Sequence, residues 1–408
     1  MASYYSVASG NWSSAAVWSS TVGGAGGAGV PTYGDVAWIE SGTTVALNSG
    51  DVVSQVLVDG GTLNQMADMT GIISMRGGTY NSNNYTMNIS AWGIAYTGGT
   101  MNLGTSTMNL YVSGSRNDIF LMNPSTTYSF YQNTTLNINI AYSGTPATIY
   151  FGNANTVNWG TINITSTVAG AEVIFQSTTG ATSTVRNLSI SGTVQVDFTA
   201  SCTYRISNSL TTSGGKLRST TPGTRYTLSS ATSQTVYSTD IEDSAAAGGG
   251  TFIAYASTDS GNNSGWSFLN APPSVTLSSP LDSSTVWTPE PQFTFIGADL
   301  EGNSITYEIQ VDITATFDSQ GSSPIIDALS STSSGFSNIT TGSDTDPFTS
   351  GNTIGYMLQI QLDDKTTYYW RVRGKDPTGS NTFGAWSATR SFVSSLGGTN
   401  FLFFFNGL

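Results

Sequence analysis

The chain contains no histidine, which limits the chemistry that its side chains could do. Without an imidazole, Ser-His-Asp and Cys-His nucleophilic sites and the usual zinc sites cannot be built. The single cysteine, Cys202, lies in an alternating β-type run, with Arg205 as its basic neighbour. A thiol in that setting is predicted to be buried rather than nucleophilic.

Paired carboxylates are the remaining route to catalysis, because two of them can hydrolyse a glycosidic bond. Between residues 46 and 235 the carboxylates are Asp51, Asp59, Asp68, Asp118, Glu172 and Asp197. None forms a tight pair in the sequence, although distant ones could meet across structural repeats. Asp240, Glu242 and Asp243 follow just outside, where a solvated turn accounts for them. We therefore predict a protein that is not an enzyme, with no catalytic residues and no cofactor.

One short acidic segment could hold a cation. Asp299, Glu301 and Asn303 occupy alternate positions before a predicted strand. Oxygen ligands at such spacing can bind calcium, and Asp344 with Asp346 offers a weaker version. Acidic residues in such a turn can also serve the turn alone, so both interpretations stay open.

Aromatic side chains on a surface with few charges can stack on sugar rings. Charged residues make up only 9% of the chain, and the candidate glycan contacts are Tyr80, Tyr85, Trp92, Tyr96 and Tyr111. Packing in the core is the alternative role for each of them.

These candidates lie in a region built from a repeated phrase. Gly-Gly-Thr-x-Asn occupies residues 60–64, 77–81 and 98–102, and Thr-Met-Asn follows at 86–88 and 107–109. Thr-apolar-Asn returns at residues 135–137, 156–158 and 161–163, among short alternating runs typical of half-buried strands. Such repeats predict a parallel β-solenoid, in which each coil buries its apolar face against the next. An antiparallel sandwich with coincidental repeats is the alternative.

The phrase also predicts where its side chains point. We expect the apolar residue of each copy to point inward and to stack from coil to coil, as for Leu63, Tyr80, Met101, Leu136 and Ile162. The neighbouring Asn would lie near a corner and hydrogen-bond to the Asn above and below. The phrase fades after residue 200, so no register is predicted there.

Composition and charge exclude several classes of protein. Aromatic residues are 11% of the chain and β-branched residues are frequent, which argues against disorder. The net charge of −13 and the lack of a basic run argue against a nucleic-acid partner and an anionic membrane surface. No apolar run approaches the length of a membrane span, so we predict no membrane insertion.

The first ten residues show no basic stretch followed by an apolar one, and a single cysteine allows no intrachain disulfide. A surface-type composition without an export signal is expected of a virion protein that lysis releases, or of a trimmed chain.

Composition shifts divide the chain into four parts. We predict a capping module at 1–45, a solenoid with its C-terminal cap at 46–270, a β-sandwich at 271–395 and an apolar tail at 396–408. Pro272-Pro273 is the expected linker, and a Ser/Gly/Asp-rich insert at 318–355 is expected to be a surface loop. The tail carries Phe401 and Phe403, and is either an added edge strand or a segment that docks on a partner.

Three segments carry a resemblance to phage and bacterial surface proteins. The first resembles the opening of β-solenoids of this kind, on Gly10, Trp12, Trp18, Val30-Pro31-Thr32, Gly34-Asp35, Ile39, Gly42 and Val45. The second resembles their last coil, on Asp259-Ser260-Gly261-Asn262-Asn263, Gly265, Trp266 and Phe268.

The third segment resembles a fibronectin type III domain, an immunoglobulin-like sandwich. The resemblance rests on "PQFTF", "ADLEGNSITYEIQV", "YYWRVRGKD" and "FGAWSATRSF". It implies that Tyr368 stands where a tyrosine corner has its tyrosine and that Trp370 and Val372 belong to the core. Trp386 and Phe392 are expected in the final strand.

Together these resemblances imply an all-β structural protein of a phage virion. We expect a tail fibre, spike or other appendage on the virion exterior, on the tail or the capsid surface, with a role in host attachment. The partners implied are other virion proteins, a host-surface glycan or protein, and two further copies of the chain in a homotrimer. A capsid-exterior decoration protein and a bacterial surface adhesin are the alternatives, and a glycan-degrading tailspike is a third hypothesis.

Overall fold

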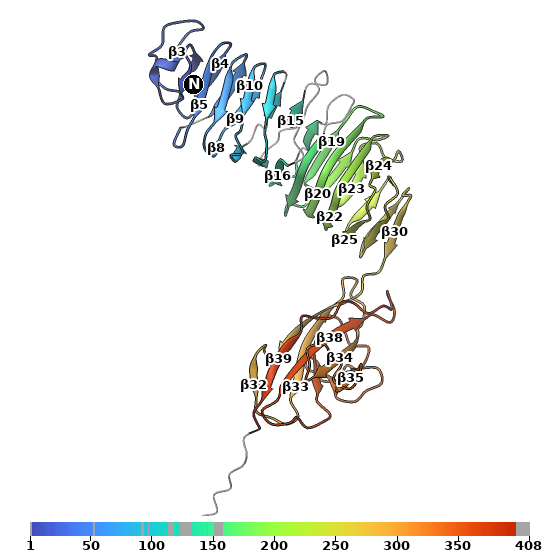
Figure 1. The fold of residues 1–408 in the computed structure, drawn as a ribbon. Helices are drawn as coiled ribbons and strands as arrows, with labels where there is room; N and C mark the ends of the chain where they lie inside the picture. The colour runs from blue at the N-terminus through green and yellow to red at the C-terminus, as the bar shows by residue number, and fades with distance from the viewer. Residues whose placement is uncertain are drawn as a thin grey trace, which may run out of the picture. The chain divides into compact units, whose positions relative to one another are not determined.

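The structure of the chain is a computed structural model. It describes residues 2–51, 54–90, 94–96, 98–112, 118–122, 133–144, 146–150 and 158–396. The chain divides into two compact units, Met1–Phe268 and Leu269–Leu408 (Figure 1). Within the described residues every regular element is a strand, apart from the short 3-10 helix η1 (Ala15–Val17). The predicted all-β class is confirmed.

The first unit winds through three sheets. The largest has thirteen strands, which are β1 (Ser3–Ser6), β3 (Trp18–Ser19), β4 (Val36–Glu40), β6 (Gln55–Asp59), β9 (Ile72–Met75), β12 (Ile94–Tyr96), β15 (Asp118–Met122), β17 (Ala147–Tyr150), β19 (Glu172–Gln176), β21 (Gln195–Phe198), β23 (Lys216–Ser219), β26 (Asp240–Glu242) and β29 (Thr258–Gly261).

The second sheet has five strands, which are β2 (Gly10–Asn11), β5 (Thr44–Leu47), β7 (Thr62–Gln65), β10 (Thr79–Asn81) and β13 (Thr100–Asn102). The third has twelve, which are β8 (Met69–Thr70), β11 (Met87–Ser90), β14 (Thr107–Val112), β16 (Thr135–Ile140), β18 (Asn158–Ser166), β20 (Thr182–Gly192), β22 (Thr203–Ser213), β24 (Tyr226–Ser229), β25 (Gln234–Tyr237), β27 (Ser244–Ala247), β28 (Phe252–Tyr255) and β30 (Trp266–Leu269).

Strand order shows that these sheets form a parallel β-solenoid. Neighbours within one sheet come from successive coils, as in β4, β6 and β9, and they pair in parallel. Parallel neighbours require a crossover between them, which here is the rest of the coil. The solenoid prediction is confirmed for this unit, and the antiparallel alternative is wrong.

The repeated phrase forms two separate inward files rather than one. Leu63, Tyr80 and Met101 stack in register in the five-stranded sheet. Leu136 and Ile162 belong to the twelve-stranded sheet, where they continue the file of Met87 and Met108. Each expected inward residue is buried. The later Thr-apolar-Asn copies at 135–137 and 161–163 therefore continue the Thr-Met-Asn series of 86–88 and 107–109, and not the Gly-Gly-Thr-x-Asn series.

The asparagines of the phrase form hydrogen-bonded ladders, as predicted. In the twelve-stranded sheet the Nδ2 of Asn109, Asn137 and Asn163 each donates at 2.8 Å to the Oδ1 of the asparagine one coil earlier. In the five-stranded sheet Asn81 and Asn102 donate in the same way. Asn109 and Asn137 lie in the middle of β14 and β16 on the outward face, and not at a corner.

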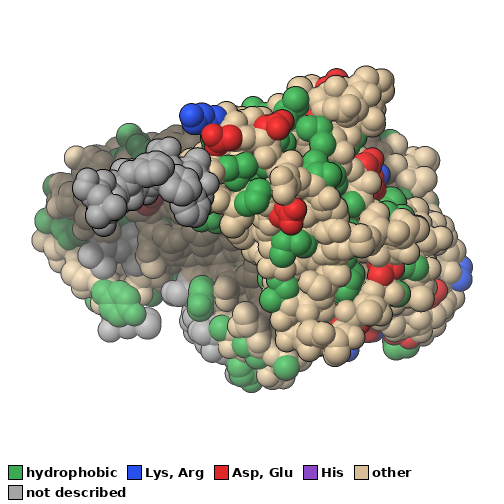
Figure 2. Space-filling model, turned by 90° about the horizontal axis from the view of Figure 1, so that it is seen from below, with side chains coloured by type: hydrophobic (Ala, Val, Ile, Leu, Met, Phe, Trp, Pro, Cys, Tyr) green, Lys and Arg blue, Asp and Glu red, His purple; other side chains and the backbone are tan. Residues whose placement is uncertain are grey.

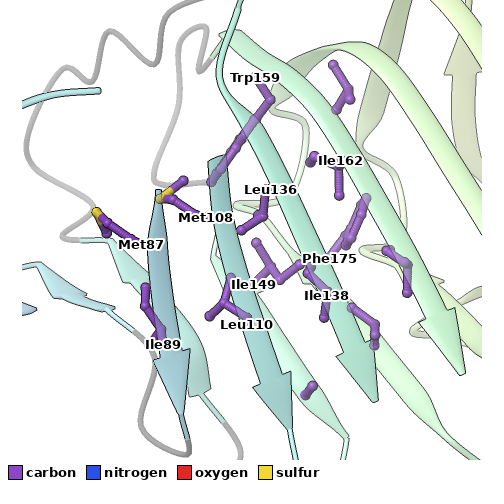
Figure 3. Packing of buried hydrophobic residues seen from close by; sticks show 14 of the residues in the cluster. Met87, Ile89, Met108, Leu110, Leu136, Ile138, Ile149, Trp159, Ile162 and Phe175 are labelled. Carbon is purple, nitrogen blue, oxygen red and sulfur yellow. The ribbon is translucent and has the colours of Figure 1, made fainter. Parts of the chain in front are cut away.

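One continuous apolar core runs along the solenoid. Figure 3 shows part of it, with Met108, Leu136 and Ile162 on neighbouring strands of one sheet and Ile149 and Phe175 among the same cluster. Because each coil supplies only a few apolar side chains, stacking is what removes them from water.

Aromatic residues close the first coils. Trp12 and Trp18 are buried and pack edge to face, with ring centroids 4.8 Å apart. Strand β3 pairs with β1 antiparallel, in contrast to the parallel strands that follow. Strands β1 and β2 join the same sheets as later coils, so the predicted capping module is built into the solenoid.

The second unit is a β-sandwich of two sheets. One contains β31 (Ser274–Ser279), β33 (Gln292–Ala298), β36 (Phe336–Asn338) and β37 (Thr353–Met357). The other contains β32 (Ser284–Val286), β34 (Thr306–Asp312), β35 (Ile326–Leu329), β38 (Thr367–Lys375) and β39 (Arg390–Ser394), and only the β32–β39 pair is parallel.

The sandwich core matches most of the sequence expectations. Trp370, Val372 and Phe392 are buried, and Tyr368 accepts a hydrogen bond from the Asp363 backbone N–H at 3.0 Å. Trp386, however, precedes β39 and lies against the guanidinium groups of β38. It was expected in the final strand, and that expectation is wrong.

The insert at 318–355 is not a surface loop. It contains β35, β36 and the start of β37, and it contributes Ala328 and Ile354 to the core. The tail at 396–408 lies outside the described residues apart from Leu396.

Candidate functional site

The predicted glycan contacts fall into three groups. Tyr80 is fully buried, and its hydroxyl contacts the Gln65 amide oxygen and the Met87 sulfur. Burial also raises its pKa above the usual value. The prediction that Tyr80 contacts a glycan is therefore wrong, because the inward register of β10 places its side chain in the core.

Tyr85 and Tyr111 are on the surface, with 37% and 58% of their side chains exposed. Trp92 lies outside the described residues. Tyr96 belongs to β12, and its side chain lies outside the described residues. Tyr111 is the candidate that borders a cavity.

That cavity is a hollow of about 390 Å³ on the outer surface of the solenoid, where β14, β16, β18 and β20 end. Its size is within the range of ligand sites. The lining residues carry hydroxyl, amide and apolar groups, and none is charged; they are Tyr111, Asn139, Ile140, Ala141, Thr165, Ser166, Thr167, Val168, Ser191 and Gly192.

Local backbone structure keeps this hollow in place. Ser166 is buried, and its hydroxyl donates to the Ile140 carbonyl of the preceding coil at 2.7 Å. Gly192 has a φ of +84°, and a Cβ there would lie 1.9 Å from the Ser166 carbonyl oxygen. A glycine is required at this close approach, so the coil turns sharply beside the hollow.

The predicted calcium ligands form a hydrogen-bonded turn in the sandwich. Asp299 Oδ1 accepts the backbone N–H groups of Glu301 and Asn303, at 3.0 and 2.8 Å. Glu301 and Asn303 in turn bind the segment before β31, through the Ala271 N–H and the Asn270 amide. Asp299 Oδ2 is buried and has no hydrogen-bond partner among the described residues. This geometry is compatible with both interpretations of the acidic residues, as a hydrogen-bonded turn and as calcium ligands.

Metal-binding chemistry has no stronger candidate among the described residues. No group of three or more His, Cys, Asp or Glu side chains there could hold a metal ion. Calcium at Asp299, Glu301 and Asn303 therefore stays a prediction, and it depends on the buried Asp299 Oδ2 together with amide and backbone oxygens of the turn.

Two carboxylates meet across coils, which the sequence left open. Asp197 on β21 is 5% exposed and interacts with Glu172 on β19 of the preceding coil. Burial, hydrogen bonding to Glu172 and repulsion from its charge raise the pKa of Asp197 to about 8. Near neutral pH the Asp197 carboxyl therefore keeps its proton. The coil repeat brings these residues together, and their spacing in the sequence gives no local sign of it.

The other chemical candidates have structural partners. Arg218 forms ion pairs with Asp240 and Glu242, so these carboxylates are not in a solvated turn. Asp243 is buried and accepts the Gly223 N–H at 2.8 Å. Cys202 is buried, and its thiol donates to the Thr178 carbonyl at 3.0 Å.

Similarity to known proteins does not add to this description. Comparison of the chain with protein-family models, with curated proteins and with solved structures finds no match.

Proposed function

We propose that this chain is a structural protein on the exterior of a phage particle, as a tail fibre, spike or other appendage that takes part in host attachment. The observation that carries the proposal is the single apolar core, with its asparagine ladders, that continues from coil to coil. Such stacking makes an extended, stiff support, because each coil holds its neighbours in register. The fibronectin type III resemblance of the sandwich fits a module that displays or attaches.

The surface is in keeping with this role. Acidic side chains are dispersed over the face in Figure 2, among many uncharged ones, and basic side chains are few there. With a net charge of −13, the chain should stay soluble and avoid nucleic acid. Within the described residues no helix has the length and apolarity of a membrane span.

Immunogold electron microscopy of intact particles tests the proposal. We expect gold on the particle exterior, and the position of the label separates tail from capsid surface. Label on the bacterial envelope instead would support the adhesin alternative and contradict the proposal. Light scattering of the purified protein should give the mass of a homotrimer.

A glycan-degrading activity is the second candidate, because Glu172 and Asp197 form a carboxylate pair. Asp197 is almost fully buried, whereas a glycosidase needs both carboxyl groups to reach the sugar. We therefore propose no hydrolysis. Reducing ends released steadily from host capsule by the purified protein, and not by Asp197→Asn, would establish the enzyme instead.

A further inference from the structure

One outward file of the twelve-stranded sheet differs from the asparagine ladder beside it. Strand pairing places the following residues at equivalent positions of successive coils: Tyr111, Asn139, Thr165, Ser191, Ser213 and Tyr237. Tyr255 continues the file by one more coil, and Ser90 precedes Tyr111 in the same register. We call this file the outward track.

The polar groups of the outward track are free to bind a ligand. Asn137, two residues before Asn139 on β16, donates to Asn109 and accepts from Asn163. Among the described residues, no side-chain hydrogen bond involves Asn139 or Thr165, and Thr165 is exposed. The amides of the asparagine ladder hydrogen-bond to one another. The outward track instead presents unpaired amide and hydroxyl groups, which can both donate and accept hydrogen bonds.

Exposed tyrosines lie near both ends of the outward track. Tyr111 is 58% exposed and Tyr237 is 42% exposed. Tyr237 stacks on Tyr255, with ring centroids 5.6 Å apart and an interplanar angle of 22°. Large aromatic side chains left in water along one file of the sheet are available to cover an apolar ligand surface.

The hollow beside Tyr111 makes this part of the outward track concave. It is lined by the track residues Tyr111, Asn139, Thr165 and Ser191, and no lining residue is charged. A carboxylated or sulfated ligand would find no cation there, and it would meet a protein of net charge −13. The chemistry of the hollow therefore selects an uncharged ligand.

We propose that the outward track binds a linear, uncharged oligosaccharide that lies along the solenoid axis. The C–H face of a sugar ring would pack on Tyr111, and hydroxyl groups would bond to Asn139, Thr165 and Ser191. From Tyr111 to Tyr237 the track crosses five strand spacings of ~4.8 Å, or roughly 24 Å. A chain of several sugar units spans that length, and the stacked Tyr237 and Tyr255 hold its far end. The inference rests on the proposed attachment function and assigns the ligand class to it.

Calorimetric titration of the full chain with defined oligosaccharides tests the inference. The probes are disaccharides and hexasaccharides of neutral β-glucan, α-glucan and chitin, beside hyaluronan hexasaccharide as an anionic probe. We expect at least one neutral hexasaccharide to bind more tightly than its own disaccharide, with no binding of hyaluronan. Tyr111→Ala should weaken both lengths roughly tenfold. Tyr237→Ala should weaken the hexasaccharide alone.

Tyr33→Ala is the matched control, because Tyr33 is 85% exposed and lies outside the outward track. Its affinities should equal those of the unchanged chain, and circular dichroism should show that all three variants are folded. Failure of every neutral probe, tighter binding of hyaluronan, or equal losses in Tyr33→Ala and Tyr111→Ala would each overturn the inference.

This outcome is separable from that of the proposed function. A protein found on the particle exterior that binds none of the neutral probes would refute the ligand assignment alone. Binding of a neutral hexasaccharide by a protein found on the cell envelope would refute the phage proposal and keep the outward track.

Discussion

The carboxyl of Asp197 makes the folded solenoid sensitive to pH. Its pKa is about 8 in the folded state, against an ordinary value of 3.8, so the folded state holds a proton that the unfolded chain has lost. The contribution of the protonated Asp197 carboxyl to the stability of the folded state is complete below about pH 4, and it is lost as pH rises through about 8. Alkaline conditions should therefore weaken the region around β19 and β21.

Asp197→Asn should remove that pH dependence, because an amide can still donate to Glu172 but cannot ionise. Scanning calorimetry at about pH 5 and about pH 8.5 should show a smaller fall in melting temperature for the variant. At the higher pH we expect the variant to melt about 2 °C or more above the unchanged chain. Glu172→Gln should act in the same direction, because it removes the charge that repels ionised Asp197. Equal pH slopes for all three proteins would contradict a protonated Asp197.

Calcium binding by the turn at Asp299 can be tested in the same way. If the buried Oδ2 of Asp299 faces a cation, millimolar calcium should raise the melting temperature of the sandwich through preferential binding to the folded state. Asp299→Asn should abolish the effect, and Glu290→Gln, a change at an exposed carboxylate, should keep it. A calcium response that survives in Asp299→Asn would place the ion elsewhere.

Residue-level predictions failed where register or long-range pairing decides the outcome. Tyr80 shares the inward position of Leu63 and Met101, so the repeat itself contained the reason why it cannot touch a glycan. Glu172 and Asp197 are different, because only the coil length brings them together. No local pattern in the sequence encodes that length.

At the scale of one strand, the asparagine ladder should contribute measurable stability. Asn137→Ala removes one amide that donates to Asn109 and accepts from Asn163, and leaves both of them half-satisfied. We expect a loss of about 1–2 kcal/mol in the free energy of unfolding by urea. Asn139→Ala, on the same strand and face, should cost less than about 0.5 kcal/mol. Similar losses in both variants would argue against a stabilising ladder.

The Gly-Gly turn makes a second prediction at this scale. Gly78 has a φ of +70°, and a Cβ there would lie 2.1 Å from the Gly61 carbonyl oxygen of the preceding coil. Gly50 has a φ of +87° with open space around it. Gly50→Ala should therefore cost about 1 kcal/mol from backbone strain alone. Gly78→Ala should cost at least twice as much by denaturant titration, and an equal cost would rule out the close coil contact.

Strands could be predicted from the sequence where apolar and polar residues alternate over a long run, and they were missed where the run is short. The runs in β16 and β38 gave their elements directly. In the insert, β35 and β36 are short and are flanked by Ser, Gly and Asp, so the polar composition of the segment predicted a loop instead of strands. Pairing with β34 and β37, and not local propensity, makes those segments strands.

At the scale of the whole molecule, the two units should unfold separately. Each has its own apolar cluster, and none of the buried residues is shared between the two. Calorimetry of the full chain should resolve two transitions. Asp197→Asn should move only the solenoid transition, and Trp370→Ala, which empties a buried site in the sandwich, should move only the other. A single transition that both variants shift would show that the units are coupled.

The asparagine ladders also give the solenoid an electrical direction. Every donor in them points to the preceding coil, from Asn163 to Asn137 to Asn109 to Asn88, and from Asn102 to Asn81 to Asn64. Amide dipoles that are aligned head to tail add together and polarise one another, much as peptide dipoles do along a helix. Each ladder therefore carries partial positive charge at its N-terminal end and partial negative charge at its C-terminal end. The two ends of each ladder are thus electrostatically unlike, so a molecule bound along the outer face would meet a different field at each.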